Sequence, residues 1–143
     1  MPTFMTIGYQ GRTVDDVVAM LEAADVKVLV DVRLTPLSRK PGLSKNRLAA
    51  RLREAGIDYR HLPQLGNPRD NRDAFRRHEE AAVARYRDEL RTPEGQAALG
   101  QLIRLARQQR VALMCFEADP ATCHRSMVAD ALGEIGPVRT VHL

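Results

Sequence analysis

Residues 26–32 read VKVLVDV, a run of aliphatic side chains broken by one lysine before it ends on Asp31 and Val32. A strand with one face in water alternates apolar and polar residues, whereas a strand buried on both faces is almost continuously apolar. The run therefore predicts a strand in the middle of a parallel sheet. RVALMCF at 110–116 has the same character and predicts a second buried strand.

The rest of the chain alternates between strand and helix patterns. The order expected is a strand over 3–7, a helix over about 14–24, the strand over 26–32, a helix between Ser44 and Gly56, a strand over 57–62, helices over about 70–91 and 93–109, the strand over 110–116, a helix from about residue 122 and a strand over 138–143. This alternation predicts an α/β fold: one compact, Rossmann-like domain over residues 1–143, with a mainly parallel sheet of about five strands and helices on both faces.

Length and composition set the class of protein. A chain of 143 residues with 44% hydrophobic content can bury a core without disulfides or metals. Its two cysteines, Cys115 and Cys123, match neither a disulfide framework nor the spacing of a structural zinc site, so we expect reduced thiols. No apolar run approaches the roughly 18 residues of a membrane span. We therefore expect a soluble, unprocessed, cytoplasmic protein with no membrane partner.

The positive charge is concentrated in one segment. Residues 33–60 contain eight Lys or Arg against two acids, a net charge of +6, while the whole chain is +4. Such a segment is compatible with a phosphate backbone, so a nucleic-acid-binding module is one hypothesis. In residues 69–91, seven arginines are offset by six acids, which is typical of a solvated helix surface.

The reactive side chains fall mainly where the expected strands end. In an open parallel sheet, the carboxyl ends of the strands and the starts of the following helices form the ligand-binding edge. The candidates that this rule gives for ligand binding are Tyr9, Asp31, Arg33, Ser38, Arg39, His61 and Arg125, and those for catalysis are Glu117, Cys123 and His124.

Several of these residues have a structural alternative. Asp31 either anchors the following loop or belongs to the site, and His61 is either a hydrogen-bonded histidine at a strand end or a ligand residue. Glu117 either caps a turn or acts as a general acid or base. Cys123 is either a small buried side chain or a thiolate, because a helix start and an adjacent cation lower the pKa of a thiol. Cys115, inside the strand, is expected in the core.

Four ordered motifs carry a family resemblance. TIGYQGRTVDD, LVDVRLTPLSRKPGLSKNRL, AGIDYRHLPQLGNPR and ALMCFEADPATCHRSMVADAL resemble the bacterial and archaeal family called domain of unknown function 488. The resemblance implies a compact α/β fold and no particular reaction. It marks as motif positions Asp31, Arg33, Ser38, Gly66, Glu117, Cys123, His124 and Arg125. Two residues depart from the pattern: Gln10 replaces a frequent Glu, which argues against a required carboxylate there, and Leu43 replaces a Phe.

These observations favour an enzyme with a pocket for a phosphate-like or nucleotide-like anion at the carboxyl edge of the sheet. Arg33, Arg39 and Arg125 would hold the anion, and Glu117 or His124 would move a proton. The cofactor, the substrate and the oligomeric state are not identified from the sequence.

Two further hypotheses carry less support. Rhodaneses and cysteine phosphatases place five residues between the reactive cysteine and the arginine, whereas here nine separate Cys115 from Arg125, and one separates Cys123 from Arg125. Transfer through a thiol is therefore a weak analogy. A metal site built from Cys123, His124, His61 and Glu117 is not predicted, because adjacent Cys and His rarely bind one ion.

Overall fold

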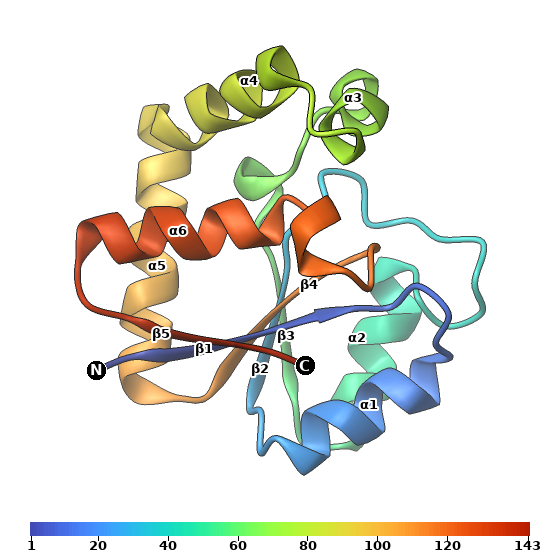
Figure 1. Cartoon of the computed structure of the whole chain (residues 1–143). Coiled ribbons are helices and arrows are strands. Elements are labelled where there is room, and N and C mark those ends of the chain that lie inside the picture. Colours follow the sequence, from blue (N-terminus) through green and yellow to red (C-terminus); the bar gives the residue numbers. More distant parts are fainter.

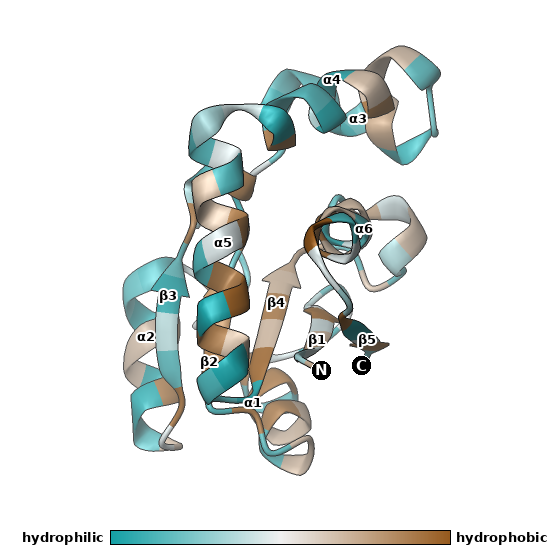
Figure 2. Cartoon of the chain, turned by 90° about the vertical axis from the view of Figure 1, so that its left-hand side faces the viewer, coloured by the Kyte–Doolittle hydropathy of each residue, from teal (hydrophilic) through white to brown (hydrophobic).

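A computed structural model describes all residues 1–143, and its central element is a sheet of five parallel strands in the order β3-β2-β4-β1-β5 (Figure 1). The strands are β1 (Thr3–Gly8), β2 (Val28–Asp31), β3 (Asp58–His61), β4 (Val111–Cys115) and β5 (Arg139–His142). The predicted α/β fold with about five strands is confirmed, and every pairing is parallel. The two strands predicted to be buried, β2 and β4, lie next to each other in the sheet, and Figure 2 shows hydrophilic colour on the edge strand β3 and hydrophobic colour on β4.

Helices cover both faces of the sheet. They are α1 (Val14–Ala23), α2 (Lys45–Glu54), α3 (Arg72–Arg76), α4 (Glu80–Arg91), α5 (Pro93–Gln108) and α6 (Arg125–Ile135), with 3-10 turns η1 (Pro63–Leu65), η2 (Arg69–Asn71) and η3 (Pro120–Thr122). Alternate residues of a strand point to opposite faces, which gives two cores. Met5 packs in one core with α1 and α2, while Phe4 packs in the other with α4, α5 and α6.

Local sequence signals explain two helix ends. Thr13 Oγ1 accepts a hydrogen bond from the Asp16 amide, and the Asp16 carboxylate accepts one from the Thr13 amide, which forms a capping box at the start of α1. Gly56 follows α2 with φ of 75°, a left-handed conformation that glycine adopts without strain. The chain then enters β3.

The prediction of one continuous helix over 70–91 is wrong. The structure has η2, α3 and α4 in this range, with a break between Arg76 and Glu80. His78 has φ of 58°, and a left-handed residue cannot continue a right-handed helix. The break lets α3 and α4 lie beyond the sheet in Figures 1 and 2.

The start of the last helix is also later than predicted. The chain from Pro120 to Thr122 forms the turn η3, Cys123 is extended, and α6 begins at Arg125 with His124 as its N-cap. Ser44 occupies the N-cap position of α2, as expected, but its hydroxyl bonds the backbone of Ser38 rather than an amide of the helix.

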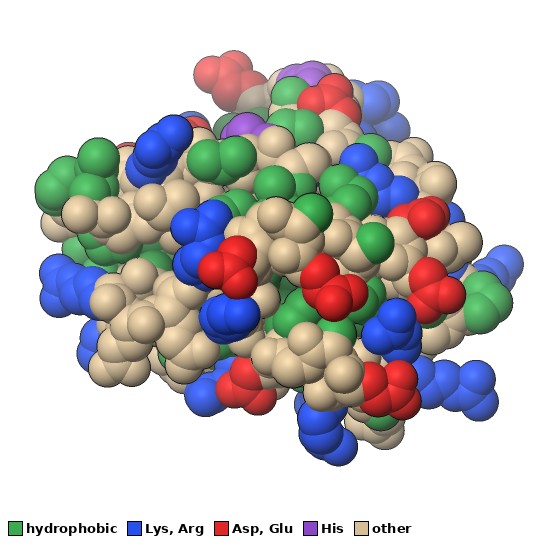
Figure 3. Space-filling view, turned by 90° about the horizontal axis from the view of Figure 1, so that it is seen from below, with side chains coloured by type: hydrophobic (Ala, Val, Ile, Leu, Met, Phe, Trp, Pro, Cys, Tyr) green, Lys and Arg blue, Asp and Glu red, His purple; other side chains and the backbone are tan.

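The surface away from the carboxyl edge carries charges of both signs. Figure 3 shows acidic and basic side chains interspersed on this face, with apolar atoms between them. None of the helices combines the length and the apolar composition that crossing a membrane requires.

Candidate functional site

The register of the sheet brings the predicted residues to one edge. Gly8 pairs with Cys115, while Asp31 pairs with His61 on one side and with Met114 on the other. A pocket of about 140 Å³ opens there. Its walls include four of the predicted site residues, namely Tyr9, Arg33, Glu117 and His124, together with Cys115, Thr122, Asn67, Arg72, Phe75 and Arg76.

Asp31 and Arg33 bind each other. Arg33 Nε lies 2.8 Å from Asp31 Oδ1, and Arg33 Nη2 lies 2.7 Å from Asp31 Oδ2. Tyr59 donates its hydroxyl to Asp31 at 2.6 Å, and Arg33 Nη1 donates to the Leu43 carbonyl at 2.7 Å. Asp31 is fully buried and Arg33 is 5% exposed. The pair therefore anchors the loop after β2, which is the structural role considered for Asp31 in the sequence.

The environment of this pair shifts two pKa values. Burial alone would lower the pKa of Arg33, but its hydrogen bonds to Asp31 and the charge of that carboxylate hold the pKa above its ordinary value. Burial and the hydrogen bond to Asp31 raise the pKa of Tyr59. Tyr9 accepts a weaker hydrogen bond from Arg33 at 3.3 Å and lies under the guanidinium, 5.3 Å from ring centroid to Cζ. All donors and acceptors at the pair are thus occupied by the fold, except one Nη2 hydrogen of Arg33.

Two histidines hold the same stretch of backbone. His124 Nε2 lies 2.9 Å from the Val32 carbonyl oxygen, and His61 Nε2 lies 2.7 Å from the Arg33 carbonyl oxygen. Since a carbonyl oxygen only accepts, each Nε2 carries the hydrogen. Burial lowers the pKa of His124, whose ring packs edge-on against Tyr86. His124 faces the pocket, whereas His61 is not part of its wall.

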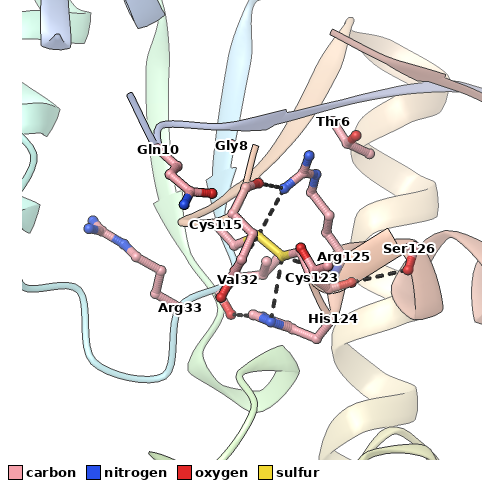
Figure 4. The surroundings of a disulfide bond; sticks show 12 residues. Thr6, Gly8, Gln10, Val32, Arg33, Cys115, Cys123, His124, Arg125 and Ser126 are labelled. Atoms are coloured by element: carbon pink, nitrogen blue, oxygen red, sulfur yellow. Dashed lines mark hydrogen bonds between the residues drawn. A yellow bond between two sulfur atoms is a disulfide. The ribbon is translucent and has the colours of Figure 1, made fainter. Parts of the chain in front are cut away.

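Arg125 is buried at the start of α6. Its side chain is 0% exposed and points under β1, where Nη1 donates to Cys115 Sγ at 3.2 Å and to the Glu117 carbonyl, and Nη2 donates to the Ala118 carbonyl at 3.0 Å (Figure 4). Nε has no partner. Desolvation lowers the pKa of Arg125 to about 10. Arg125 is therefore a buried cation, and it does not line the pocket.

The expectation of two reduced thiols is wrong. The structure joins Cys115 and Cys123 by a disulfide, and no free cysteine remains (Figure 4). The physical reason is the path of residues 116–122, which turn back through η3 and return Cys123 to the end of β4. Both cysteines are 1% exposed and belong to the core on the α6 face. Cys123 in this state is not a thiolate nucleophile.

Glu117 faces arginines that the sequence analysis assigned to a solvated helix surface. Its carboxylate lies 2.9 Å from Arg76 Nε, and its side chain is 12% exposed. Arg72, one turn earlier on α3, also lines the pocket. Sequence reasoning missed both arginines, because nothing local distinguishes them from the other five arginines between residues 69 and 91.

Close backbone contacts explain two glycines at this edge. A Cβ at Gly66, one of the family motif positions, would lie 2.5 Å from the backbone nitrogen of Leu34. A Cβ at Gly8 would lie 1.8 Å from the carbonyl oxygen of Glu117. Only glycine lets the segments after β2 and β4 pass this closely.

Ser38 and Arg39 line a second, more open hollow of about 440 Å³. Its walls are Thr35, Leu37, Ser38, Arg39, Ser44, Arg69 and Arg72, and it shares Thr35, Leu37 and Arg72 with the first pocket. Three guanidinium groups and no carboxylate line it. The two hollows thus lie next to each other, and we call them together the edge groove, with a basic outer part and an inner part that contains Glu117 and His124.

The residues that could hold a metal ion differ from those considered in the sequence. Cys115, Cys123 and His124 offer ligand atoms within 4.8 Å of one another, whereas Glu117 and His61 are not in this group. The disulfide removes the two thiolates as ligands, and the Arg125 guanidinium 3.2 Å from Cys115 Sγ opposes a cation. The donor set as folded does not fit a metal.

Fold and site define a single-domain parallel α/β protein with a groove at the carboxyl edge of its sheet. The chain belongs to the family described as "Domain of unknown function DUF488", whose model matches residues 13–132. Neither a curated protein nor a solved structure matches the chain. The family membership agrees with the resemblance seen in the motifs and supplies no reaction.

Proposed function

We propose that the protein binds a small anionic ligand of the phosphate type in the outer part of the edge groove, and that it acts as an enzyme on the part of the ligand that enters the inner pocket. The observation that carries the proposal is the cluster of Arg39, Arg69 and Arg72 around one hollow without an acidic residue. Guanidinium groups bind phosphate and carboxylate through paired, charge-assisted hydrogen bonds.

The three arginines have donors to spare. Arg39 and Arg69 have no hydrogen-bond or ion-pair partner in the fold, and Arg72 donates only its Nε, to the Asn67 carbonyl at 3.4 Å. Arg33, in contrast, is committed to Asp31, and Arg125 is enclosed by backbone carbonyls. The anion is therefore assigned to Arg39, Arg69 and Arg72 in the outer part of the groove. Of the three arginines that the sequence suggested for this role, only Arg39 is retained.

The inner pocket supplies the groups for proton transfer. Glu117 and His124 both line it, and the guanidinium of Arg76 holds the Glu117 carboxylate at its edge. A carboxylate within reach of a bound ligand is a competent general acid or base. Glu117 is the primary candidate, because the Nε2 hydrogen of His124 is already donated to Val32.

A small anion is a better candidate ligand than a long nucleic acid, because several arginines of the basic segment 33–60 form ion pairs within the protein. Arg33, Arg51 and Arg60 of residues 33–60 are neutralised by Asp31, Asp15 and Asp58. The +6 charge of the segment is thus not one continuous free surface, and the chain has only 4% aromatic residues for base stacking.

Substitution of Arg72 tests the proposal. We expect R72Q to weaken binding of inorganic phosphate or pyrophosphate about tenfold or more, because a hydrogen bond to a charged group contributes roughly 1.5–3 kcal/mol. Isothermal titration calorimetry at low salt measures the affinity. R107Q, the same charge change on an exposed arginine of α5, is the matched control and should stay within about twofold of wild type. Equal affinities for R72Q and R107Q, or no binding by the wild type, would contradict the proposal.

Substitution of Glu117 should have the opposite effect on binding. We expect E117Q to bind phosphate roughly fivefold more tightly, about 1 kcal/mol, because a negative charge is removed and Arg76 is released toward the groove. If Glu117 also moves the proton, the same variant turns over no substrate. E134Q at the exposed end of α6 is the control. Weaker phosphate binding by E117Q would mean that the carboxylate supports the ligand rather than competing with it.

A further inference from the structure

Arg125 is a buried cation without a counter-ion. Its guanidinium contacts Cys115 Sγ and two backbone carbonyls, its Nε is unpartnered, and no carboxylate forms an ion pair with it. Removing a cation from water costs several kcal/mol unless an anion compensates it. The fold therefore keeps a positive charge buried beside a neutral disulfide, which supplies no compensating negative charge.

Reduction of the disulfide would create the missing anion. A thiol next to a guanidinium has a lowered pKa and becomes a thiolate, and Cys115 Sγ already lies 3.2 Å from Arg125 Nη1. We propose that Cys115 and Cys123 form a redox-active dithiol–disulfide centre, in which reduction leaves Cys115 as a thiolate paired with Arg125 and Cys123 as a thiol. A single disulfide in a chain with two apolar cores is not needed as a structural framework, which also favours a chemical role.

His124 provides the acceptor for the Cys123 thiol. Its Nε2 hydrogen is donated to Val32, so Nδ1 has a free lone pair, and this atom lies 3.8 Å from Cys123 Sγ. The buried ring is kept neutral, as its lowered pKa indicates. The two sulfurs thus have different surroundings, a cation for Cys115 and a neutral acceptor for Cys123.

The other charges around the centre favour one thiolate. The charged and titratable groups that face the sulfurs or Arg125 are Arg12, Arg33, Arg72, Arg76, Glu117, Asp119, His124 and His142. Glu117 Oε2 opposes a thiolate from 3.9 Å, but its own charge is offset by Arg76 at 2.9 Å. Arg125 is nearer to Cys115 than Glu117 is, and it has no competing anion, so its effect dominates.

The pocket defines the class of reaction partner. Cys115 lines the inner pocket and Cys123 does not, and about 140 Å³ admits only a small molecule. A thiolate of a low-molecular-weight dithiol attacks Cys115 Sγ, the bond to Cys123 Sγ breaks, and Cys123 leaves and takes up one proton. The second sulfur of the dithiol, as a thiolate, then attacks the dithiol sulfur that is bonded to Cys115. This closes the disulfide of the small molecule and releases Cys115 as the thiolate. The dithiol is oxidised to a disulfide, the protein gains two electrons, and one net proton is released.

This proton balance is measurable in the wild-type protein. At equilibrium with reduced and oxidised dithiothreitol, we expect the equilibrium constant for reduction to rise about tenfold from pH 7 to pH 8, because one proton is released per protein reduced. Formation of two ordinary thiols would leave it nearly unchanged. Mass spectrometry after quenching and alkylation measures the reduced fraction.

Single-cysteine variants assign the thiolate. By thiolate absorbance near 240 nm, we expect C123S to hold about nine-tenths or more of Cys115 as thiolate at pH 7, against a few per cent of Cys123 in C115S. R125M should abolish the tenfold rise of the equilibrium constant between pH 7 and pH 8. If R125M does not fold, the measurements on the wild type and on the single-cysteine variants still test the proposal. The test does not involve phosphate, so its outcome is independent of the proposed function.

Four results would overturn the proposal. The first is an equilibrium constant that is the same at pH 7 and pH 8, and the second is a thiolate in C115S rather than in C123S. The third is that both cysteines remain reduced, and are therefore fully alkylated after quenching, even in oxidised dithiothreitol. The fourth is stoichiometric binding of zinc by the reduced protein with release of both thiol protons. The last result would assign the cysteines to a metal site instead.

Discussion

D31N should destabilise the protein by about 3–5 kcal/mol, because it leaves the Arg33 guanidinium buried without its counter-charge. Asparagine has the shape of aspartate, so the loss reports charge and hydrogen bonding rather than a cavity. Two of the four hydrogen bonds from the Arg33 side chain and the one from the Tyr59 hydroxyl end on the carboxylate. Urea unfolding followed by circular dichroism measures the change in the free energy of unfolding.

The control for D31N is D58N on the neighbouring strand β3. Asp58 pairs with Arg60 at 3.2 Å, but both side chains are about half exposed, so the pair contributes no more than about 1 kcal/mol. A loss of similar size in the two variants would contradict the anchoring role of Asp31. If D31N unfolded the protein completely, Asp31 would still have the anchoring role, and its contribution to stability would be larger than expected.

G8A should also destabilise the protein, by about 1–3 kcal/mol, because the new Cβ would lie 1.8 Å from the Glu117 carbonyl oxygen. That atom is backbone and cannot rotate away, so residues 117–118 must shift. The same shift moves two of the carbonyls that bind Arg125. Thermal and urea unfolding measure the loss.

G133A is the matched control for G8A. A Cβ at Gly133, in the last turn of α6, meets no atom within 4 Å, and alanine is the better helix former by roughly 1 kcal/mol. We therefore expect G133A to be neutral or stabilising. A G8A protein as stable as G133A would mean that the segment after β4 is not held against β1.

The sequence predicts the two buried strands but not their order in the sheet, because burial on both faces leaves a local pattern and strand pairing does not. VKVLVDV and RVALMCF are mostly apolar, and these segments become the neighbouring strands β2 and β4. The rule that ligands bind at the carboxyl edge then brings Tyr9, Arg33, Glu117 and His124 to one pocket. These predictions need only local patterns and one topological rule.

Features that depend on tertiary pairing were not predicted. Arg33, which is predicted to bind a ligand, forms an ion pair with Asp31, two residues away in the sequence, and this pair was not foreseen. Arg72 and Arg76 looked like solvated helix residues, because the positive φ of His78, which ends α3 and separates it from α4, leaves no clear mark in the sequence. The proximity of Cys115 and Cys123 depends on how residues 116–122 turn, which spacing alone does not give.

Site-resolved amide chemical shifts during a titration with inorganic phosphate test the central claim most directly. The account predicts saturable shifts in residues 34–39 and 69–76, the two segments that supply the arginines of the edge groove. It also predicts that these shifts are much reduced in R72Q and retained in R107Q. Shifts confined to residues 45–60 on α2 and β3, or shifts that never saturate, would contradict the account.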